Sequence, residues 1–162
     1  MILRKYLFIF SVFLMVSCTS EDPQIDGVNE NPDTNVGTDA SYEGQILQLL
    51  NNHRASKGLA KLEVLDIIKS QTDKHTDYMI SAGAISHANF SDRGKYLSDN
   101  AGAKNIGENV AVGYNTAQSV VTGWINSDGH RKNIEGNFTH FNLTAKQNSN
   151  GRWYYTNIFI RK

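Results

Sequence analysis

Three residues have side chains that could do chemistry together: His87, Glu108 and His130, each in a short segment rich in small residues. Two neutral imidazoles and a carboxylate suit zinc or a similar divalent ion, and an incomplete protein shell leaves room for water. A bound ion would lower the pKa of that water and make a nucleophile at neutral pH. Without an ion, Glu108 would act as a base toward water near a histidine. We therefore treat these three residues as candidate metal ligands and candidate catalytic residues.

Serine and cysteine give no comparable candidate for a nucleophile. Cys18 is the only cysteine and precedes the folded part, and Ser86 and Ser127 lack a recognisable nucleophile turn. The chemistry therefore depends on the histidines and the carboxylate.

Three further histidines have simpler explanations. His53 is predicted to be a surface or packing residue of the first helix. His75 lies on an apolar helical stripe and is predicted to be a hydrogen-bonded core residue. His140 is close in sequence to His130 and is considered as an extra ligand, but on a strand it is expected to face solvent or to pack.

Two long helices are predicted before the candidate residues. An apolar stripe of helical period follows Ser41 and stops at Gly58. A second stripe runs through residues 65–82 and is closed by Gly83.

The segments around His87 and Glu108 are shorter. His87 falls just after the second helix, and residues 91–100 indicate a short helix with Tyr96 and Leu97 facing inward. Residues 104–113 surround Glu108 with apolar residues and indicate a short extended run combined with a turn.

His130 is expected to follow a further helix. Thr116 is a suitable N-cap for a helix over residues 117–126. Gly129 is predicted to end that helix and to turn His130 toward a cleft.

The last part of the domain alternates as strands do. Residues 138–147 and 152–160 are predicted strands, and residues 148–151 form a hairpin turn between them.

Three motifs occur in order: Ser-His-x-x-Phe from Ser86, Gly-Glu-Asn-Val-Ala from Gly107, and Trp-Ile-Asn-Ser-x-Gly-His-Arg-x-Asn-Ile from Trp124. Together they resemble the CAP superfamily of cysteine-rich secretory proteins, antigen 5 and plant pathogenesis-related proteins, in its bacterial, cysteine-poor branch. The resemblance covers residues 42–160. It implies an α+β fold, specifically a three-layer α-β-α sandwich.

The sequence departs from that family at one site position. Many eukaryotic members have two histidines and two acids, with the second acid three residues after the helix tryptophan. Here that position is Ser127, and the adjacent Asp128 is expected to point elsewhere on the helix. The resemblance therefore leaves His87, Glu108 and His130 as the site.

The N-terminal part predicts export and lipid anchoring. Residues 1–17 have a positive start and an apolar run, as in a signal peptide, and residues 15–18 resemble the lipobox of bacterial lipoproteins. A lipid on Cys18 would tether the protein to the membrane, whereas a plain signal peptide with an incidental cysteine is the alternative. Residues 18–40 are acidic and poor in apolar residues, which predicts a flexible linker to a CAP domain over residues 41–162.

The distribution of charged residues indicates where the protein is located and which partners it is expected to lack. Acidic residues directly after Cys18 resemble surface-export signals, which suggests anchoring in the bacterial outer membrane with exposure at the cell surface. The formal net charge is zero, which argues against nucleic acid as a partner.

Two functions fit these expectations. The first is a membrane-tethered binding module whose site holds a divalent metal and takes a lipid, glycan or peptide. The second is a metal-dependent hydrolase acting on peptide or cell-envelope polymer. A purely structural role for the three residues is the remaining possibility, and the fold alone does not choose among them.

Overall fold

The computed structural model describes residues 41–162, so the predicted signal segment, Cys18 and the linker lie outside the described residues. No helix in this part of the chain is both long and apolar enough to cross a membrane. In chain order the elements are α1 (Tyr42–Ser56), β1 (Glu63–Val64), α2 (Asp66–Ala82), α3 (Phe90–Ala101), β2 (Asn105–Val112), α4 (Ala117–Asn126), α5 (Asp128–Ile134), β3 (His140–Gln147) and β4 (Trp153–Arg161).

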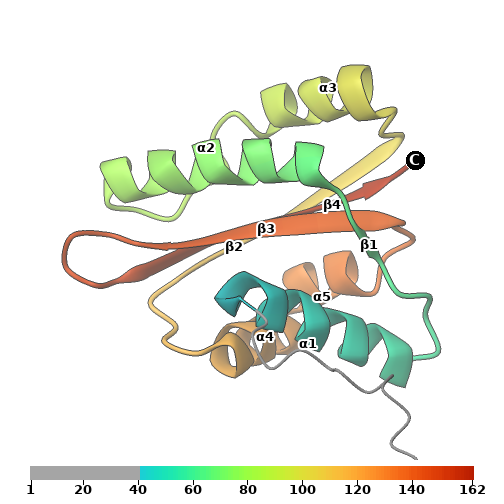
Figure 1. Cartoon of the computed structure of the whole chain (residues 1–162), viewed down its shortest axis with the longest axis horizontal. Helices are drawn as coiled ribbons and strands as arrows, with labels where there is room; N and C mark the ends of the chain where they lie inside the picture. The colour runs from blue at the N-terminus through green and yellow to red at the C-terminus, as the bar shows by residue number, and fades with distance from the viewer. Residues whose placement is uncertain (1–40) are drawn as a thin grey trace, which may run out of the picture. The chain divides into compact units, whose positions relative to one another are not determined.

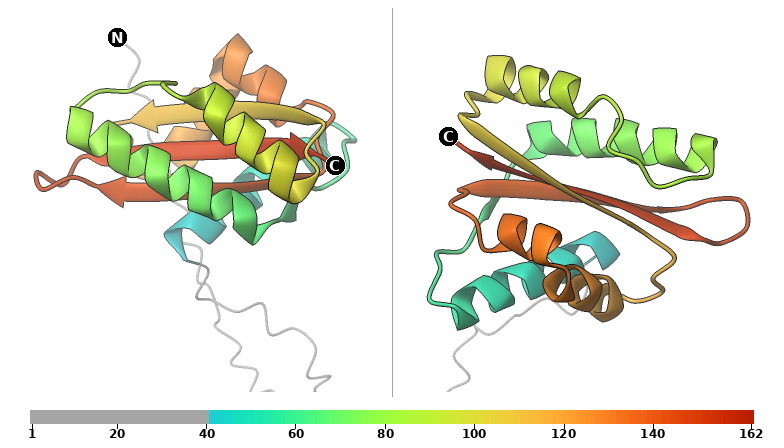
Figure 2. Two further views of the ribbon diagram at one scale, coloured as in Figure 1. Left: turned by 90° about the horizontal axis from the view of Figure 1, so that it is seen from above. Right: turned by 180° about the vertical axis from the view of Figure 1, so that it is seen from behind.

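The four strands form one mixed sheet in the order β1-β3-β4-β2. β3 and β4 make the predicted antiparallel hairpin, β2 pairs antiparallel with β4, and β1 pairs parallel with β3. Helices α2 and α3 cover one face, and α1, α4 and α5 cover the other (Figures 1 and 2). The predicted α-β-α sandwich is therefore confirmed.

Each face of the sheet has its own apolar core. Trp124 of α4, Tyr155 of β4 and Phe141 of β3 belong to the large core beneath α1, α4 and α5. Ile68 of α2 and Leu97 of α3 belong to a smaller core on the opposite face. Because neighbouring residues of a strand point to opposite faces, an edge strand can send adjacent side chains into two different layers.

Capping residues set several helix ends, and the sequence predicts those at Thr116 and Gly83. The Ser41 side chain accepts a hydrogen bond from the Gly44 amide at the start of α1. Thr116 and Ser119 form a capping box at the start of α4. Gly83 ends α2 in the left-handed conformation, with φ 66°.

The prediction that Gly129 ends α4 is wrong. Helix α4 ends at Asn126, and Ser127 adopts an extended conformation, with φ −99° and ψ 120°. The Ser127 carbonyl then accepts a hydrogen bond from the Arg131 amide at 2.8 Å and starts α5. Gly129 is the second residue of α5 and its φ is not positive, so it has no capping role and His130 lies inside a helix.

The predicted inward orientation of Tyr96 is also wrong. Arg93 and Leu97 are buried and lie four residues apart, so together they define the inner face of α3. Tyr96 is 38% exposed at the margin of that face. Around Glu108, the expected short extended run is a continuous eight-residue strand, β2.

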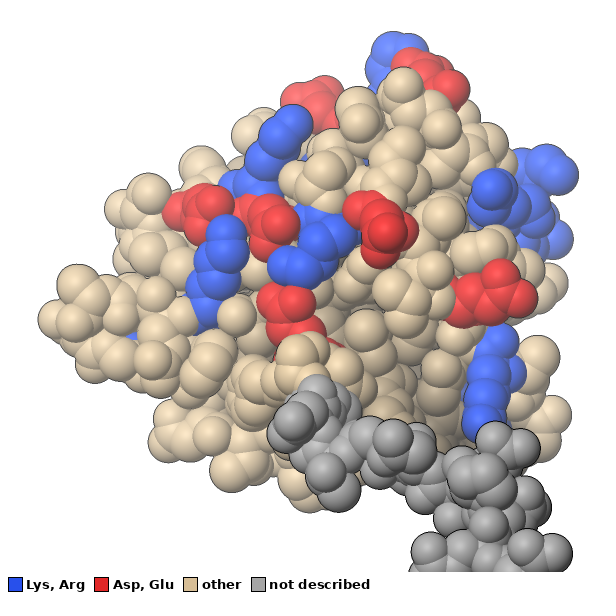
Figure 3. All heavy atoms as spheres, viewed as in Figure 1, with Lys and Arg blue, Asp and Glu red and all other residues tan. Residues whose placement is uncertain are grey.

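Charged side chains of both signs are interspersed on the face shown in Figure 3. Over α2 and β3 they form pairs: Lys69 Nζ lies 2.7 Å from Asp73 Oδ1, and Lys146 Nζ lies 2.9 Å from Asp77 Oδ1. The Lys146 pair joins α2 to β3, and positive and negative side chains alternate over these two elements.

Candidate active site

Glu108 lies on the edge strand β2 and points toward α3. Its side chain is only 1% exposed. Arg93 of α3 donates from Nε to Oε2 and from Nη2 to Oε1, both at 2.8 Å. This bidentate pairing compensates the buried carboxylate and fixes its orientation.

His87 lies in the loop between α2 and α3 and rests on Glu108. Its Nδ1 is 2.8 Å from Glu108 Oε1, and its side chain is 56% exposed. Because a carboxylate can only accept, Nδ1 carries the hydrogen in this contact. In the neutral ring, Nε2 then keeps its lone pair for a ligand.

His75 of α2 contacts the same loop through a hydrogen bond. Its Nε2 lies 2.7 Å from the Ser86 carbonyl and 3.8 Å from Glu108 Oε1. Burial lowers the pKa of His75, partly opposed by the Ser86 hydrogen bond and by Glu108. His75 is thus the buried, hydrogen-bonded histidine that the sequence predicts, but the sequence does not predict its position beside the site.

His130 belongs to α5 and lies on the other side of β2. Its ring is half-buried, and Nδ1 is buried without a hydrogen-bond partner in the described part of the chain. Burial lowers the pKa of His130, and the nearby His87 lowers it further. The two histidines are therefore electrostatic neighbours, and His130 favours its neutral form.

Asparagines hold α5 against β2. Asn109 donates from Nδ2 to the His130 carbonyl at 3.1 Å. Asn133 donates from its own Nδ2 to Asn109 Oδ1 at 2.8 Å and to the Glu108 carbonyl at 3.1 Å. Two adjacent residues of β2 thus hold both histidines. The Glu108 side chain contacts the His87 ring, and the Asn109 side chain bonds the His130 backbone.

The residues around the α4–α5 junction have structural contacts. Arg131 donates from Nη1 to the Ile125 carbonyl at 2.9 Å and also pairs with Asp128. The Asp128 side chain is 83% exposed and points into solvent. Ser127, at the position of the second family acid, lines a pocket instead.

That pocket has a volume of about 240 Å³ and lies beside His130. Apolar and aromatic residues dominate its lining, which consists of Ile85, Val110, Ala111, Val112, Tyr114, Gly123, Trp124, Ser127 and His130. We call it the His130 pocket. It offers an apolar surface next to a neutral imidazole.

The remaining histidines contact other residues. His53 Nε2 lies 2.8 Å from Glu135 Oε1 and joins α1 to the end of α5. His140 Nδ1 lies 2.8 Å from the Thr139 hydroxyl, and its Nε2 is 3.5 Å from Glu63. Both histidines are thus engaged in structural contacts away from the candidate site.

The donor set can be tested against a divalent ion. No group of three or more histidine, cysteine, aspartate or glutamate side chains within residues 41–162 converges as metal ligands do. Both Glu108 oxygens already accept hydrogen bonds from Arg93, and Oε1 also meets His87. The side chains left to coordinate an ion are therefore the imidazoles of His87 and His130, and Glu108 holds the first of them.

Sequence reasoning missed two supporting residues. Arg93 lies four residues before Leu97 on the inner face of α3, and an arginine on a buried stripe needs an anionic partner, so its spacing could have revealed it. His75 has no comparable signal, because a buried polar helix residue finds its partner only through tertiary packing.

Comparisons with known proteins agree with this architecture. Residues 47–159 match the CAP, cysteine-rich secretory protein, family model. The chain is 34% identical over 122 residues to the "Uncharacterized protein YkwD" and 32% identical over 124 residues to the "Uncharacterized membrane protein YlbC", both of Bacillus subtilis. These alignments cover 68% and 74% of this chain but only 46% and 34% of the relatives.

Solved structures are similar over the same region. An extracellular protein containing an SCP domain from Bacillus anthracis has a TM-score of 0.64 at 28% identity, covering 75% of this chain and 40% of its own. An outer surface protein of Borrelia burgdorferi has a TM-score of 0.67 at 17% identity, covering 76% of this chain and 96% of its own. A cysteine-rich secretory protein of Staphylococcus aureus has a TM-score of 0.63 at 19% identity, covering 78% and 40%. The last two likenesses concern the fold alone.

Proposed function

The chain belongs to the CAP family of cysteine-rich secretory proteins, and on that premise we propose that it is an extracellular binding module with His87 and His130 at its ligand-binding centre. The name of one similar protein, an extracellular protein containing an SCP domain, supports a secreted location. The proposal includes a lipid on Cys18 that tethers the module to the membrane.

The observation that carries the proposal is the contact between His87 Nδ1 and Glu108 Oε1 at 2.8 Å. A carboxylate that accepts from one ring nitrogen fixes the tautomer and directs the other nitrogen toward a ligand. The Arg93 ion pair prevents Glu108 from turning away. This arrangement favours a prepared ligand-binding histidine over an incidental surface residue.

His130 supplies the second imidazole. Burial lowers its pKa and so favours the neutral ring, and its Nδ1 lacks any partner in the described residues. A buried nitrogen without a partner costs free energy unless a ligand, ion or water satisfies it. We infer that His87 and His130 together hold a divalent ion such as zinc, with Glu108 as the orienting group. A bound ion would supply positive charge for a carboxylate or carbonyl of the ligand.

The His130 pocket suggests which part of a ligand would lie beside this centre. Its apolar lining, with Trp124 and Ile85, favours a peptide side chain or a short acyl segment over a hydroxyl-rich group. A peptide or lipid that also carries a carboxylate or carbonyl group fits both features.

The hydrolase alternative has less support because it needs a base that reaches the ligand. Glu108 is 1% exposed, and both its oxygens face donors on Arg93. It acts through His87 in this arrangement. We therefore place binding ahead of hydrolysis.

Calorimetric titration of zinc into the purified chain tests the centre. We expect micromolar affinity, at least about tenfold weaker in His87→Ala and in His130→Ala, because each removes one ligand. His140→Ala is the matched control and should bind as the wild type does. Absence of binding, or binding that survives the double variant, would remove the metal from the proposal. Zinc-dependent cleavage of peptides by the wild type, lost in His130→Ala, would instead favour the hydrolase.

A further inference from the structure

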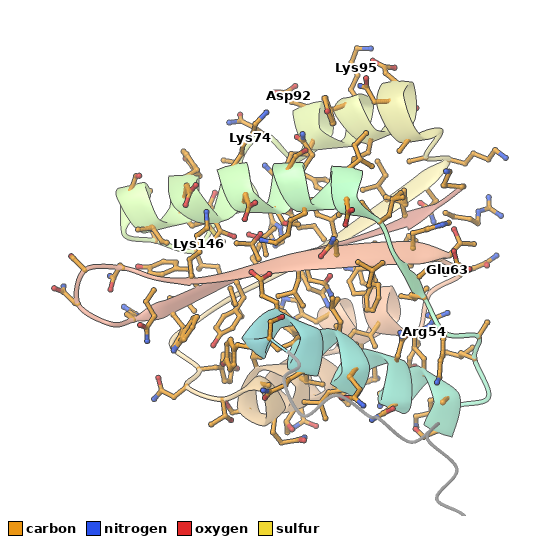
Figure 4. All side chains as sticks on the ribbon, in the orientation of Figure 1. Arg54, Glu63, Lys74, Asp92, Lys95 and Lys146 are labelled. Carbon is orange, nitrogen blue, oxygen red and sulfur yellow. The ribbon has the colours of Figure 1, made fainter. Side chains whose placement is uncertain are left out.

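A second pocket lies in the other helical layer, between α2 and α3. It has a volume of about 310 Å³ and is lined by Gln71, Lys74, His75, Tyr78, Asn89, Asp92, Arg93 and Tyr96. We call it the α2–α3 groove. In Figure 4, Lys74 extends from α2 and Asp92 from the start of α3 on the same side of the molecule. Its lining residues do not include His87 or His130.

Two tyrosines form its aromatic walls. Tyr78 of α2 is 44% exposed and Tyr96 of α3 is 38% exposed, which makes them two of the most exposed large apolar side chains in residues 41–162. Tyr78 stacks on His75 with ring centroids 5.9 Å apart and an interplanar angle of 14°. Lys74 Nζ lies 5.9 Å from the centre of the Tyr96 ring. Both rings are thus oriented by neighbours and still present surface to solvent.

Polar groups with unused hydrogen-bonding capacity line the same groove. Gln71 is 5% exposed, and its amide nitrogen bonds the Ser70 hydroxyl while its amide oxygen has no partner among the described residues. The side chains of Asn89 and Asp92 likewise have no hydrogen bond or ion pair within residues 41–162. A pocket that contains planar acceptors and donors without partners is equipped for a ligand rich in hydroxyl groups.

Asn89 has an unusual backbone conformation at this place. Its φ is 58°, and among the described residues it is the only non-glycine with positive φ. It occupies the N-cap of α3, yet its side chain makes no capping hydrogen bond. Strained conformations of this kind cluster at ligand sites, and here the strain frees an amide that would otherwise cap the helix.

The charges of the groove restrict the net charge of a ligand that can bind there. Arg93 is already compensated by Glu108 and also donates to the Ala88 carbonyl at 2.7 Å. Lys74 and Asp92 then contribute one charge of each sign. An anionic ligand would meet Asp92 and a cationic one would meet Lys74, so the balance favours a neutral ligand.

We propose that the α2–α3 groove binds a neutral glycan. The C–H face of a sugar ring packs on Tyr96 or Tyr78, and sugar hydroxyls bond Asp92, Asn89 and the Gln71 oxygen. The volume lies at the lower end of the range of small-molecule sites, about 300–1,000 Å³, which suits a short segment of glycan. The lining of this site contains neither His87 nor His130, so its binding can be tested independently of the proposed centre.

The test is titration of the full chain with neutral trisaccharides, namely maltotriose, mannotriose and chitotriose, with the charged trigalacturonate for comparison. Amide chemical shifts report binding and its location. We expect at least one neutral probe to bind with a dissociation constant below about 10 mM, and trigalacturonate to bind more weakly. Tyr96→Ala should weaken binding by about tenfold, whereas Tyr96→Phe keeps the stacking surface and should stay within about twofold.

Further variants distinguish the loss of a ligand contact from a loss of folding. Asn89→Gly removes the amide but tolerates positive φ, so it should weaken binding by about fivefold with an unchanged melting temperature. Val64→Ala changes an exposed apolar residue of β1, and His130→Ala changes the other site; both should bind as the wild type does. The proposal is overturned if no neutral probe binds, if binding survives the Tyr78→Ala, Tyr96→Ala double variant, or if trigalacturonate binds more tightly.

Discussion

Arg93 and Glu108 form a buried bidentate ion pair, with Nε 2.8 Å from Oε2 and Nη2 2.8 Å from Oε1. The pair joins α3 to β2, and the same carboxylate holds His87 at 2.8 Å. The α2–α3 groove and the proposed centre thus share one buried support.

Removal of one partner of this pair should be costly. Arg93→Met leaves the Glu108 charge buried without compensation, so we expect the free energy of unfolding to fall by about 3–5 kcal/mol. Urea denaturation measures this loss. Lys95→Met is the matched control, because Lys95 pairs with Asp99 on the surface and should change stability little. The double variant Arg93→Met, Glu108→Leu should recover much of the loss. Equal effects of Arg93→Met and Lys95→Met would contradict this assignment.

His75 should make the fold sensitive to acid. Burial lowers its pKa below the ordinary 6.5. The unfolded chain therefore binds a proton at a pH where the folded chain does not, and stability falls as the pH drops below about 6.5. His75→Gln keeps an amide nitrogen to donate to the Ser86 carbonyl but does not titrate. We expect a smaller loss of stability between about pH 7 and pH 5 in this variant, measured by urea denaturation. An unchanged loss would show that other groups cause it.

Most of the fold could be predicted from sequence because local signals agree with tertiary packing. Gly83 closes α2, Thr116 caps α4, and the turn at residues 148–151 joins β3 to β4. The failures occur where a local signal is ambiguous. Glycine is common at helix ends, but Gly129 is helical because the extended Ser127 separates two short helices. The apolar character of Tyr96 predicts an inward position, whereas Leu97 occupies the core.

The site could be predicted only in part. The motifs identified His87 and Glu108, which the structure places in contact, and His130, which lies across β2 near His87. The spacing of Arg93 and Leu97 could indicate a buried arginine with an anionic partner, but it could not identify Glu108 as that partner, because the contact spans two elements and depends on the loop between α2 and α3. The different roles of His87, Glu108 and His130 are therefore set by tertiary packing and not by their spacing in the sequence.

Two glycines should respond in opposite directions to alanine. Gly129 is helical, and an added β-carbon would have no neighbouring atom within 4 Å, so Gly129→Ala should stabilise the fold by about 0.5–1 kcal/mol. Gly83 has φ 66°, so Gly83→Ala should destabilise it by about 1–2 kcal/mol. Thermal or urea denaturation of both variants decides the matter. Destabilisation by Gly129→Ala would favour a helix end at Gly129, as predicted from sequence.

Tyr155 should limit stability at alkaline pH. Its hydroxyl donates to the Tyr114 carbonyl at 2.7 Å and lies 2.9 Å from the Tyr42 hydroxyl. Burial raises the pKa of Tyr155 well above the ordinary 10.0, and the contact with Tyr42 raises it further. The unfolded chain then loses this proton first, so stability is full below about pH 10 and falls above it.

Tyr155→Phe tests this directly. The variant should lose about 1 kcal/mol at neutral pH with the hydrogen bond, yet lose less stability than the wild type between about pH 8 and pH 11. Urea denaturation at both pH values measures the difference. Tyr96→Phe, at an exposed position, should behave as the wild type does over this range. If Tyr155→Phe loses as much stability as the wild type on the alkaline side, the buried hydroxyl is not the group responsible.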